Sequence, residues 1–291
     1  MNDSMIMTRP SIIVRGGDYP LTRGMTGTYA GIHLFYDACG AEAAFATILE
    51  ARPFDVCEFS LANFGMLRDG GADRFVAIPV FLNRAFRHGV AWTCDGSDLN
   101  DLRRLAGKRI GMKEYSQTAA VWFRGLIGDE YGVDWRDIDW FVPRKQRFPA
   151  PAEARVTNVD DDLETLVLEG KLDAYVSTRV SKPGLRPVLR NHASAAEDYR
   201  RRTGILPINH TVVIERGLLG RHPQAARAVF DAYCARRVLA GETDRFGFAG
   251  ANRANVETLF RYLHEQRLTS TLQKIDDLFE LRNAVDGYDT I

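Results

Sequence analysis

The chain has 291 residues, of which 45% are hydrophobic and 26% are charged. This length and composition are typical of a globular protein with a large core, and they allow two domains. Because the formal net charge is zero, the composition gives no support for a nucleic-acid-binding or membrane-surface protein.

The cysteines and the start of the chain bear on the cellular compartment. Cys39, Cys57, Cys94 and Cys234 are widely spaced and form no CxxC pair, which is typical of reduced thiols rather than of a disulfide framework or a zinc site. Residues 1–16 lack the charged and apolar regions of a signal peptide. No stretch approaches the ~20 apolar residues of a membrane span. We therefore expect a cytoplasmic protein.

Apolar patterning in the first third of the chain predicts strands that alternate with helices. In chain order, we expect a strand at 11–17, a strand at 31–38, a helix at 41–51, a strand at 54–61, a helix closed by glycines at 61–71, and strands at 74–81 and 88–94.

The alternation continues through the rest of the chain. We expect a helix that ends near Gly107, a strand up to 115, a helix at 116–132 with Ser116 as its N-cap, a strand at 138–142, a loop or lid at 143–160, a helix, turn and strand at 161–178, a bent strand or strand pair at 204–215, a helix at 222–241 and a helical tail.

This alternation predicts an α/β protein with largely parallel sheets. Changes in composition near 94–98 and 180–200 indicate a middle segment with its own sheet. We therefore expect one discontinuous lobe from residues 1–94 and 200–291, and a second lobe from residues 95–199. A cleft between two such lobes is the usual place for a small ligand.

Common local motifs for several chemistries are missing from the sequence. It contains no GxGxxG, GxxxxGK[ST], GxSxG or HExxH pattern, so nucleotide binding, serine hydrolysis and zincin chemistry have no local signature. No histidine lies three or four residues from another, and we therefore expect no metal site built from neighbouring ligands.

Polar residues gather where the strand at 54–61 meets its helix. Glu58 is expected at the carboxyl end of this strand, followed by Ser60 and, in the first helical turn, Asn63. Open α/β sheets bind ligands at the carboxyl ends of their strands. The alternative is that Glu58 only pairs with a structural arginine.

A second junction of this kind is "KEYSQTAAVW". Glu114 and Tyr115 end a strand, and Ser116, Gln117 and Thr118 begin a helix. The free N–H groups and the dipole at a helix start favour anions. Simple N-capping also explains Ser116, but it leaves Glu114 and Tyr115 without a role.

The third junction is "FLNRAFRHG", between two apolar runs. A helical turn there would place Arg84, Arg87 and His88 on one side, where arginine forks could bind carboxylates. The alternative is a solvated connection between the two strands. His210, in "PINHTVVIE", precedes an apolar stretch, and a lone histidine of this kind is often structural.

These segments together resemble the 4,5-dihydroxyphthalate decarboxylase family. The resembling strings span roughly residues 50–225: "RPFDVCEFSLANFGMLRDGG", "FVAIPVFLNRAFRHG", "LAGKRIGMKEYSQTAAVWFRGLIGDEYGVD" and "RRTGILPINHTVVIERGLLGRHP". The resemblance implies a type II periplasmic-binding-protein-like fold, with two α/β lobes around a central cleft. Leu82 and Asn83 depart from the pattern, and such a change could alter the substrate while leaving the type of reaction.

The resemblance implies non-oxidative decarboxylation of a hydroxylated aromatic acid, either 4,5-dihydroxyphthalate, which gives protocatechuate, or a close analogue. A hydroxyl para to the carboxylate can push electrons toward the carboxylate-bearing carbon, which takes a proton before CO2 leaves. This route needs an acid, a base and cations that hold the carboxylates, and it needs no organic cofactor.

The resembling residues supply candidates for each role. The expected catalytic residues, which exchange protons with the substrate, are Glu58, His88, Glu114 and His210. The expected substrate-binding residues are Ser60, Asn63, Arg84, Arg87, Tyr115, Ser116, Gln117 and Thr118. A carboxyl acid active near neutral pH would need its pKa raised by burial, whereas the free pKa of a histidine is already near neutrality.

Two other functions remain open. The same fold serves solute-binding proteins, which need a cleft and arginines but no acid or base. Another lyase or a dehydratase acting on a cyclic carboxylate is also compatible with the fold. In every case the expected partner is a small, usually aromatic, carboxylate, and the oligomeric state is open.

Overall fold

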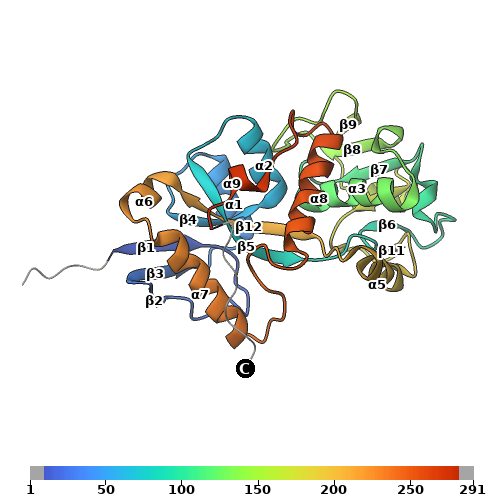
Figure 1. The fold of residues 1–291 in the computed structure, drawn as a ribbon. Coiled ribbons are helices and arrows are strands. Elements are labelled where there is room, and N and C mark those ends of the chain that lie inside the picture. Colours follow the sequence, from blue (N-terminus) through green and yellow to red (C-terminus); the bar gives the residue numbers. More distant parts are fainter. Residues whose placement is uncertain (1–9, 282–291) are drawn as a thin grey trace, which may run out of the picture.

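The computed structural model of the chain describes residues 10–281, which build two six-stranded sheets side by side (Figure 1). The first sheet has the strand order β2-β3-β1-β4-β12-β5. Its strands are β1 (Ser11–Arg15), β2 (Gly27–Tyr29), β3 (Ile32–Asp37), β4 (Val56–Ser60), β5 (Phe75–Arg84) and β12 (Ile208–Glu215). We call the part of the protein built on this sheet the first lobe.

The second sheet has the strand order β11-β6-β10-β7-β8-β9. Its strands are β6 (Ala91–Cys94), β7 (Arg109–Met112), β8 (Asp139–Pro143), β9 (Arg155–Val159), β10 (Ala174–Val176) and β11 (Leu185–Pro187). We call the part built on this sheet the second lobe.

Helices pack around and between the sheets (Figure 1). The α-helices are α1 (Ala41–Leu49), α2 (Leu61–Asp69), α3 (Thr118–Tyr131), α4 (Leu163–Leu168), α5 (His192–Thr203), α6 (Arg216–Arg221), α7 (Ala225–Leu239), α8 (Asn252–Glu265) and α9 (Ile275–Leu278). Two short 3-10 helices, η1 (Leu102–Leu105) and η2 (Trp135–Asp137), flank α3 in the sequence.

The strands β4 and β12 of the first sheet are buried on both faces, since their residues alternate between two apolar clusters. Val56, Val212 and Ile214 belong to the cluster that contains α7, whereas Cys57 and Phe59 belong to the cluster that contains α1 and α2. Such two-sided burial explains why β4 and β12 read as nearly continuous apolar runs.

The chain crosses between the lobes twice, through segments 85–90 and 204–207. These two connections lie side by side, since the Ala85 N–H donates to the Pro207 carbonyl at 3.1 Å. Helix α8 packs against both α2 of the first lobe and α3 of the second, which adds a third link between the lobes.

Several sequence expectations differ from the structure. The sheets are mixed rather than largely parallel, because β12 runs antiparallel to both of its neighbours and β6 runs antiparallel to β10 and β11. The helix expected before Gly107 is only the 3-10 turn η1, and the expected loop at 143–160 contains strand β9. Strand β6 lies in the second sheet, so the chain passes from the first sheet to the second between Arg84 and Ala91, and the expected lobe boundary at residue 94 is wrong. The end of the expected helical tail, 282–291, lies outside the described residues.

Candidate active site

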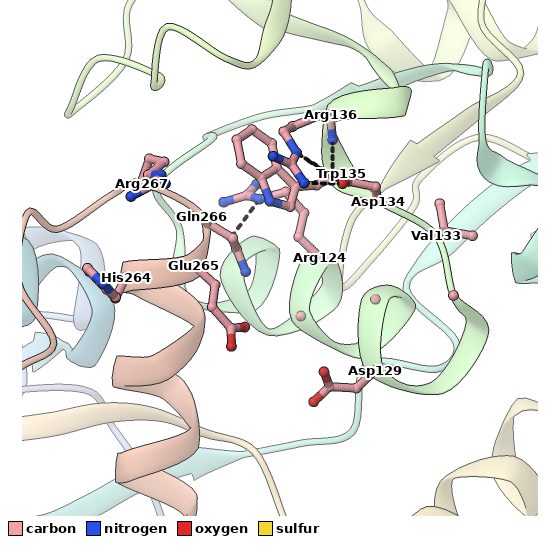
Figure 2. Close-up of a pocket in the computed structure, with 13 residues that line it drawn as sticks. Arg124, Asp129, Val133, Asp134, Trp135, Arg136, His264, Glu265, Gln266 and Arg267 are labelled. Carbon is pink, nitrogen blue, oxygen red and sulfur yellow. Dashed lines mark hydrogen bonds and ion pairs between the residues drawn. The ribbon is translucent and has the colours of Figure 1, made fainter.

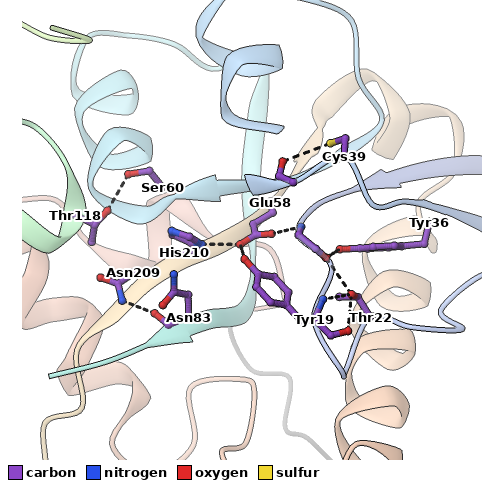
Figure 3. A network of polar contacts seen from close by, with 12 residues as sticks. Tyr19, Thr22, Tyr36, Cys39, Glu58, Ser60, Asn83, Thr118, Asn209 and His210 are labelled. Carbon is purple, nitrogen blue, oxygen red and sulfur yellow. Dashed lines mark hydrogen bonds and ion pairs between the residues drawn. The ribbon is translucent and has the colours of Figure 1, made fainter. Parts of the chain in front are cut away.

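The carboxylate of Glu58 lies at the centre of a buried polar cluster in the first lobe (Figure 3). Its side chain is 0% exposed and accepts three hydrogen bonds: from Gly17 N (2.7 Å), Tyr19 Oη (2.8 Å) and His210 Nδ1 (2.6 Å). Burial works to raise the pKa of Glu58, but the hydrogen bonds and the charge of His210 outweigh it, and this pKa lies below its ordinary value. Glu58 is therefore an ionised acceptor.

His210 reaches Glu58 because of the register between β4 and β12. Val212 lies opposite Glu58 and His210 lies opposite Ser60, so the side chains of Glu58 and His210 share one face of the sheet. An ionised carboxylate can only accept, which places the imidazole proton on Nδ1 and leaves Nε2 available.

The available nitrogen of His210 lies in a partly open environment. The side chain is 13% exposed, and within residues 10–281 Nε2 has no hydrogen-bond partner. The Phe45 ring packs edge-on against the imidazole, with 4.9 Å between the ring centroids. The pair Glu58–His210 thus presents one oriented nitrogen that can accept or deliver a proton.

The loop after β1 completes the cluster, and it requires glycine. A Cβ on Gly16 would lie 2.6 Å from the Tyr36 hydroxyl and 3.0 Å from a Glu58 oxygen. The Tyr36 hydroxyl donates to the Gly17 carbonyl at 2.7 Å and so fixes this loop. Burial and the neighbouring Glu58 charge raise the pKa of Tyr19, which therefore remains a neutral donor.

Tyr19 and this loop are not among the residues predicted from the sequence. The available signal was "RGGDY", a glycine pair directly after the first strand and hence at the same sheet edge as Ser60.

The starts of α2 and α3 meet where the lobes join. Ser60 Oγ and Thr118 Oγ1 share a hydrogen bond of 2.8 Å, and the Ala62 N–H donates to Thr118 Oγ1 at 3.1 Å. Asn63 Nδ2 donates to the Ser116 carbonyl at 3.0 Å. The structure therefore brings four predicted binding residues together, but their side chains bind one another.

The expected N-cap at Ser116 is wrong. The N-cap of α3 is Gln117, whose side chain makes no capping bond. The Ser116 hydroxyl donates instead to Glu114 Oε1 at 2.7 Å, and Glu114 Oε2 accepts from the Arg147 backbone N–H at 3.0 Å. Glu114 thus stabilises two loops of the second lobe next to the junction.

The structure does not place the predicted arginine pair beside Glu58 and His210. Arg84 ends β5 and no helical turn follows, so the expected shared face does not form. Its guanidinium donates to Asn252 Oδ1 at 2.8 Å and lies 3.8 Å from Asp244. Arg87 is 4% exposed and donates to Asn209, and burial lowers the pKa of Arg87 to about 10.

His88 and Tyr115 also lie elsewhere. His88 is buried against Tyr199, with 5.3 Å between the two ring centroids. Burial lowers the pKa of His88 to about 4, so the expectation that this histidine titrates near neutrality is wrong. Tyr115 is buried in the core of the second lobe, with the guanidinium of Arg124 3.9 Å from its ring centroid.

A pocket of about 430 Å³ lies beside the cluster. Tyr19 lines it together with Leu82, Asn83 and Arg84 from the end of β5, and Arg179 contributes from the second lobe. This volume lies within the range of small-molecule sites.

A larger pocket of about 610 Å³ lies between α3 and the end of α8 (Figure 2). Two of its arginines are already partnered: Arg136 binds Asp134, and Arg124 Nε donates to Gln266 at 2.8 Å. It contains no oriented acid–base pair, and the Glu58–His210 cluster is therefore the better candidate site.

Residues 10–281 hold no group of three or more histidine, cysteine or acidic residues arranged for a metal ion. Among the described helices, none has the length and apolar character needed to cross a membrane.

No protein-family model matches the chain. It is 28% identical over 208 residues to a protein of Comamonas testosteroni named 4,5-dihydroxyphthalate decarboxylase, a match that covers 66% of this chain and 63% of that protein. It is 26% identical over 219 residues to a Pseudomonas putida protein of the same name, covering 68% and 84%. The resemblance to 4,5-dihydroxyphthalate decarboxylases is confirmed. The match to the Comamonas protein spans less than two thirds of that protein's length.

Solved structures establish the fold. The periplasmic aliphatic sulphonate binding protein SsuA of Escherichia coli aligns with a TM-score of 0.58 and 12% identity over 97% of this chain and 96% of that one. The desulfurization enzyme DszB aligns with a TM-score of 0.51 and 16% identity, covering 92% and 96%. The two-lobed, periplasmic-binding-protein-like fold expected from the sequence is thereby confirmed, and it is a fold found in both binding proteins and enzymes.

Proposed function

We propose that the protein is a carboxy-lyase that decarboxylates a hydroxylated aromatic acid, either 4,5-dihydroxyphthalate or a close analogue. The observation that carries this proposal is the pair Glu58–His210, in which a buried carboxylate orients an imidazole with one available nitrogen. A protein that only binds a solute has no need of such a pair. The similarity to two proteins named decarboxylases supports the same choice.

The chemistry assigns His210 the proton that the ring must receive. Loss of CO2 from an aryl carboxylate requires one proton at the carbon that bears the carboxylate, and Nε2 of an imidazole can deliver it. The hydroxyl para to that carboxylate gives its own proton to water and its electrons to the ring, and the carboxylate-bearing carbon takes the proton from Nε2. The C–C bond then breaks as CO2 leaves, its electron pair restores the aromatic ring as a phenolate, and the phenolate oxygen takes a proton from water. His210 regains its proton from water after each turnover.

Glu58 has a different role from the one expected of a raised-pKa acid. Because hydrogen bonds keep the pKa of Glu58 low, it does not donate a proton near neutral pH. Its hydrogen bond instead holds the imidazole ring of His210 in one orientation, with Nδ1 bound to the carboxylate and Nε2 available. Tyr19 and Gly17 hold the carboxylate in turn.

Product analysis tests the proposal. The purified protein is incubated with 4,5-dihydroxyphthalate, and CO2 and protocatechuate are quantified. Phthalate, which has the carboxylates but no hydroxyl, is the matched control and should be inert. If none of a panel of hydroxylated benzene mono- and dicarboxylates loses CO2, the proposal is wrong.

A second candidate function is solute binding, which the alignment with SsuA favours. A binding protein would gain thermal stability from an aromatic carboxylate without converting it. Thermal shifts measured beside the product assay distinguish the two functions. We also propose a cytoplasmic location, which fractionation of the source cells would test.

A further inference from the structure

The proposed reaction requires a cation for the substrate's carboxylates, and the expected pair does not supply it. Arg84 is bound to Asn252 and lies near Asp244, while Arg87 is bound to Asn209. Neither contacts Glu58 or His210. A carboxylate bound next to His210 would therefore need a cation from another part of the chain.

Arg147 has the required placement. It lies in the second lobe, but its guanidinium extends to the first lobe, where Cζ is 5.7 Å from the centroid of the Phe45 ring. Phe45 is the ring that packs edge-on against His210 at 4.9 Å. The guanidinium of Arg147 and the imidazole that Glu58 orients therefore both lie against the Phe45 ring.

The backbone of Arg147 is held firmly, whereas its charge is available. The neighbouring Gln146 accepts from the Tyr115 N–H at 2.7 Å and donates to the Pro143 carbonyl at 2.9 Å, and the Arg147 N–H donates to Glu114 at 3.0 Å.

The guanidinium itself makes a single long hydrogen bond, 3.4 Å, to Asn63 Oδ1. Arg147 is exposed, and within residues 10–281 no carboxylate pairs with it. The other arginine of this segment, Arg144, differs because it pairs with Asp160 at 3.0 Å.

We propose that Arg147 binds a carboxylate of the substrate across the boundary between the lobes. This inference rests on the proposed function, whose substrate carries two carboxylates on adjacent ring carbons. The fork of a guanidinium binds a carboxylate through two parallel hydrogen bonds, and such a contact would replace the long bond to Asn63. The bound carboxylate would direct the ring toward Nε2 of His210.

Binding of two unreactive probes tests this inference separately from turnover. Isothermal titration gives Kd values of wild type, Arg147→Ala and Arg147→Lys for phthalate and for catechol, which has the hydroxyls but no carboxylate. Arg147→Ala should weaken phthalate binding about 10- to 100-fold, as expected for charge-assisted hydrogen bonds, and leave catechol binding unchanged. Arg147→Lys should restore part of the phthalate affinity, since lysine keeps the charge but not the fork.

Arg144→Ala is the matched control, and it should leave both Kd values unchanged. Equal phthalate binding by wild type and Arg147→Ala would overturn the inference, as would no phthalate binding by the wild type or an equal loss of catechol binding. Turnover of 4,5-dihydroxyphthalate by the wild type is measured in parallel. If the wild type converts 4,5-dihydroxyphthalate but the affinity for phthalate does not depend on Arg147, only this inference is refuted. If the affinity depends on Arg147 but no turnover occurs, only the decarboxylase proposal is refuted.

Discussion

Replacing Glu58 with glutamine separates the charge of this side chain from its shape. Three donors converge on the carboxylate, from Gly17, Tyr19 and His210. A glutamine offers them one oxygen and an NH2 group, so at least one donor loses its acceptor. His210 then loses both its fixed orientation and the charged acceptor of its hydrogen bond.

The expected magnitude follows from these two losses. An oriented acid–base group contributes about 10²- to 10⁴-fold in rate, which corresponds to roughly 2.7–5.5 kcal/mol of activation free energy. A buried donor without an acceptor costs about 1–3 kcal/mol of the free energy of unfolding. Because the variant no longer buries a charge, we expect the net loss of stability to lie near the lower end of that range.

The assay compares kcat, KM and urea unfolding for wild type and Glu58→Gln, with the exposed Glu257→Gln as control. We expect kcat to fall at least 10²-fold at nearly constant KM, and the control to match the wild type. Wild-type stability should also fall as the pH drops below about 4.5 toward the lower native pKa of Glu58, and the variant should lack this contribution. A kcat within threefold of the wild type would refute the proposed role of Glu58.

Three further predictions concern other parts of the molecule. His88→Phe should keep full activity. Between about pH 6.5 and 4 the wild type loses up to about 1.4 kcal/mol of unfolding free energy per pH unit, because only the unfolded state takes the proton, and the variant should lack this loss. Reduced kcat in this variant would contradict the placement of His88. Gly16→Ala should lower the free energy of unfolding by about 1–3 kcal/mol and remove most of the activity, because its Cβ would meet the Tyr36 hydroxyl. The control Gly96→Ala, whose Cβ meets no atom within 4 Å, should change neither chemical unfolding nor activity. Thr118→Val removes two hydrogen bonds between the lobes and should lower the unfolding free energy by about 1–3 kcal/mol, and an unchanged denaturation midpoint would contradict this contribution.

Local patterns predicted part of the site because Glu58 lies two residues before the carboxyl end of β4, where ligand groups collect in open α/β sheets. His210 lies two residues after the start of the antiparallel strand β12, which meets the same edge of the sheet. Their direct pairing depends on an antiparallel register between strands about 150 residues apart, which no local pattern specifies. The sequence therefore supplied the two residues but not the bond between them.

The arginine prediction did not succeed, for a physical reason. It assumed a helical turn after Arg84, but strand β5 continues through Arg84 and the backbone then crosses to the second lobe. Arg84 consequently meets the C-terminal part of the chain, at Asn252. Arg147 had no comparable signal, because its position opposite Phe45 depends on how the two lobes meet.

The kcat of His210→Ala on 4,5-dihydroxyphthalate, relative to that of the wild type at neutral pH, tests whether the oriented imidazole carries the proton. We predict that the wild type releases CO2 and protocatechuate and that the variant, folded by circular dichroism, is slower by at least 10²-fold. A variant rate within a factor of three of the wild-type rate would contradict the proposed mechanism.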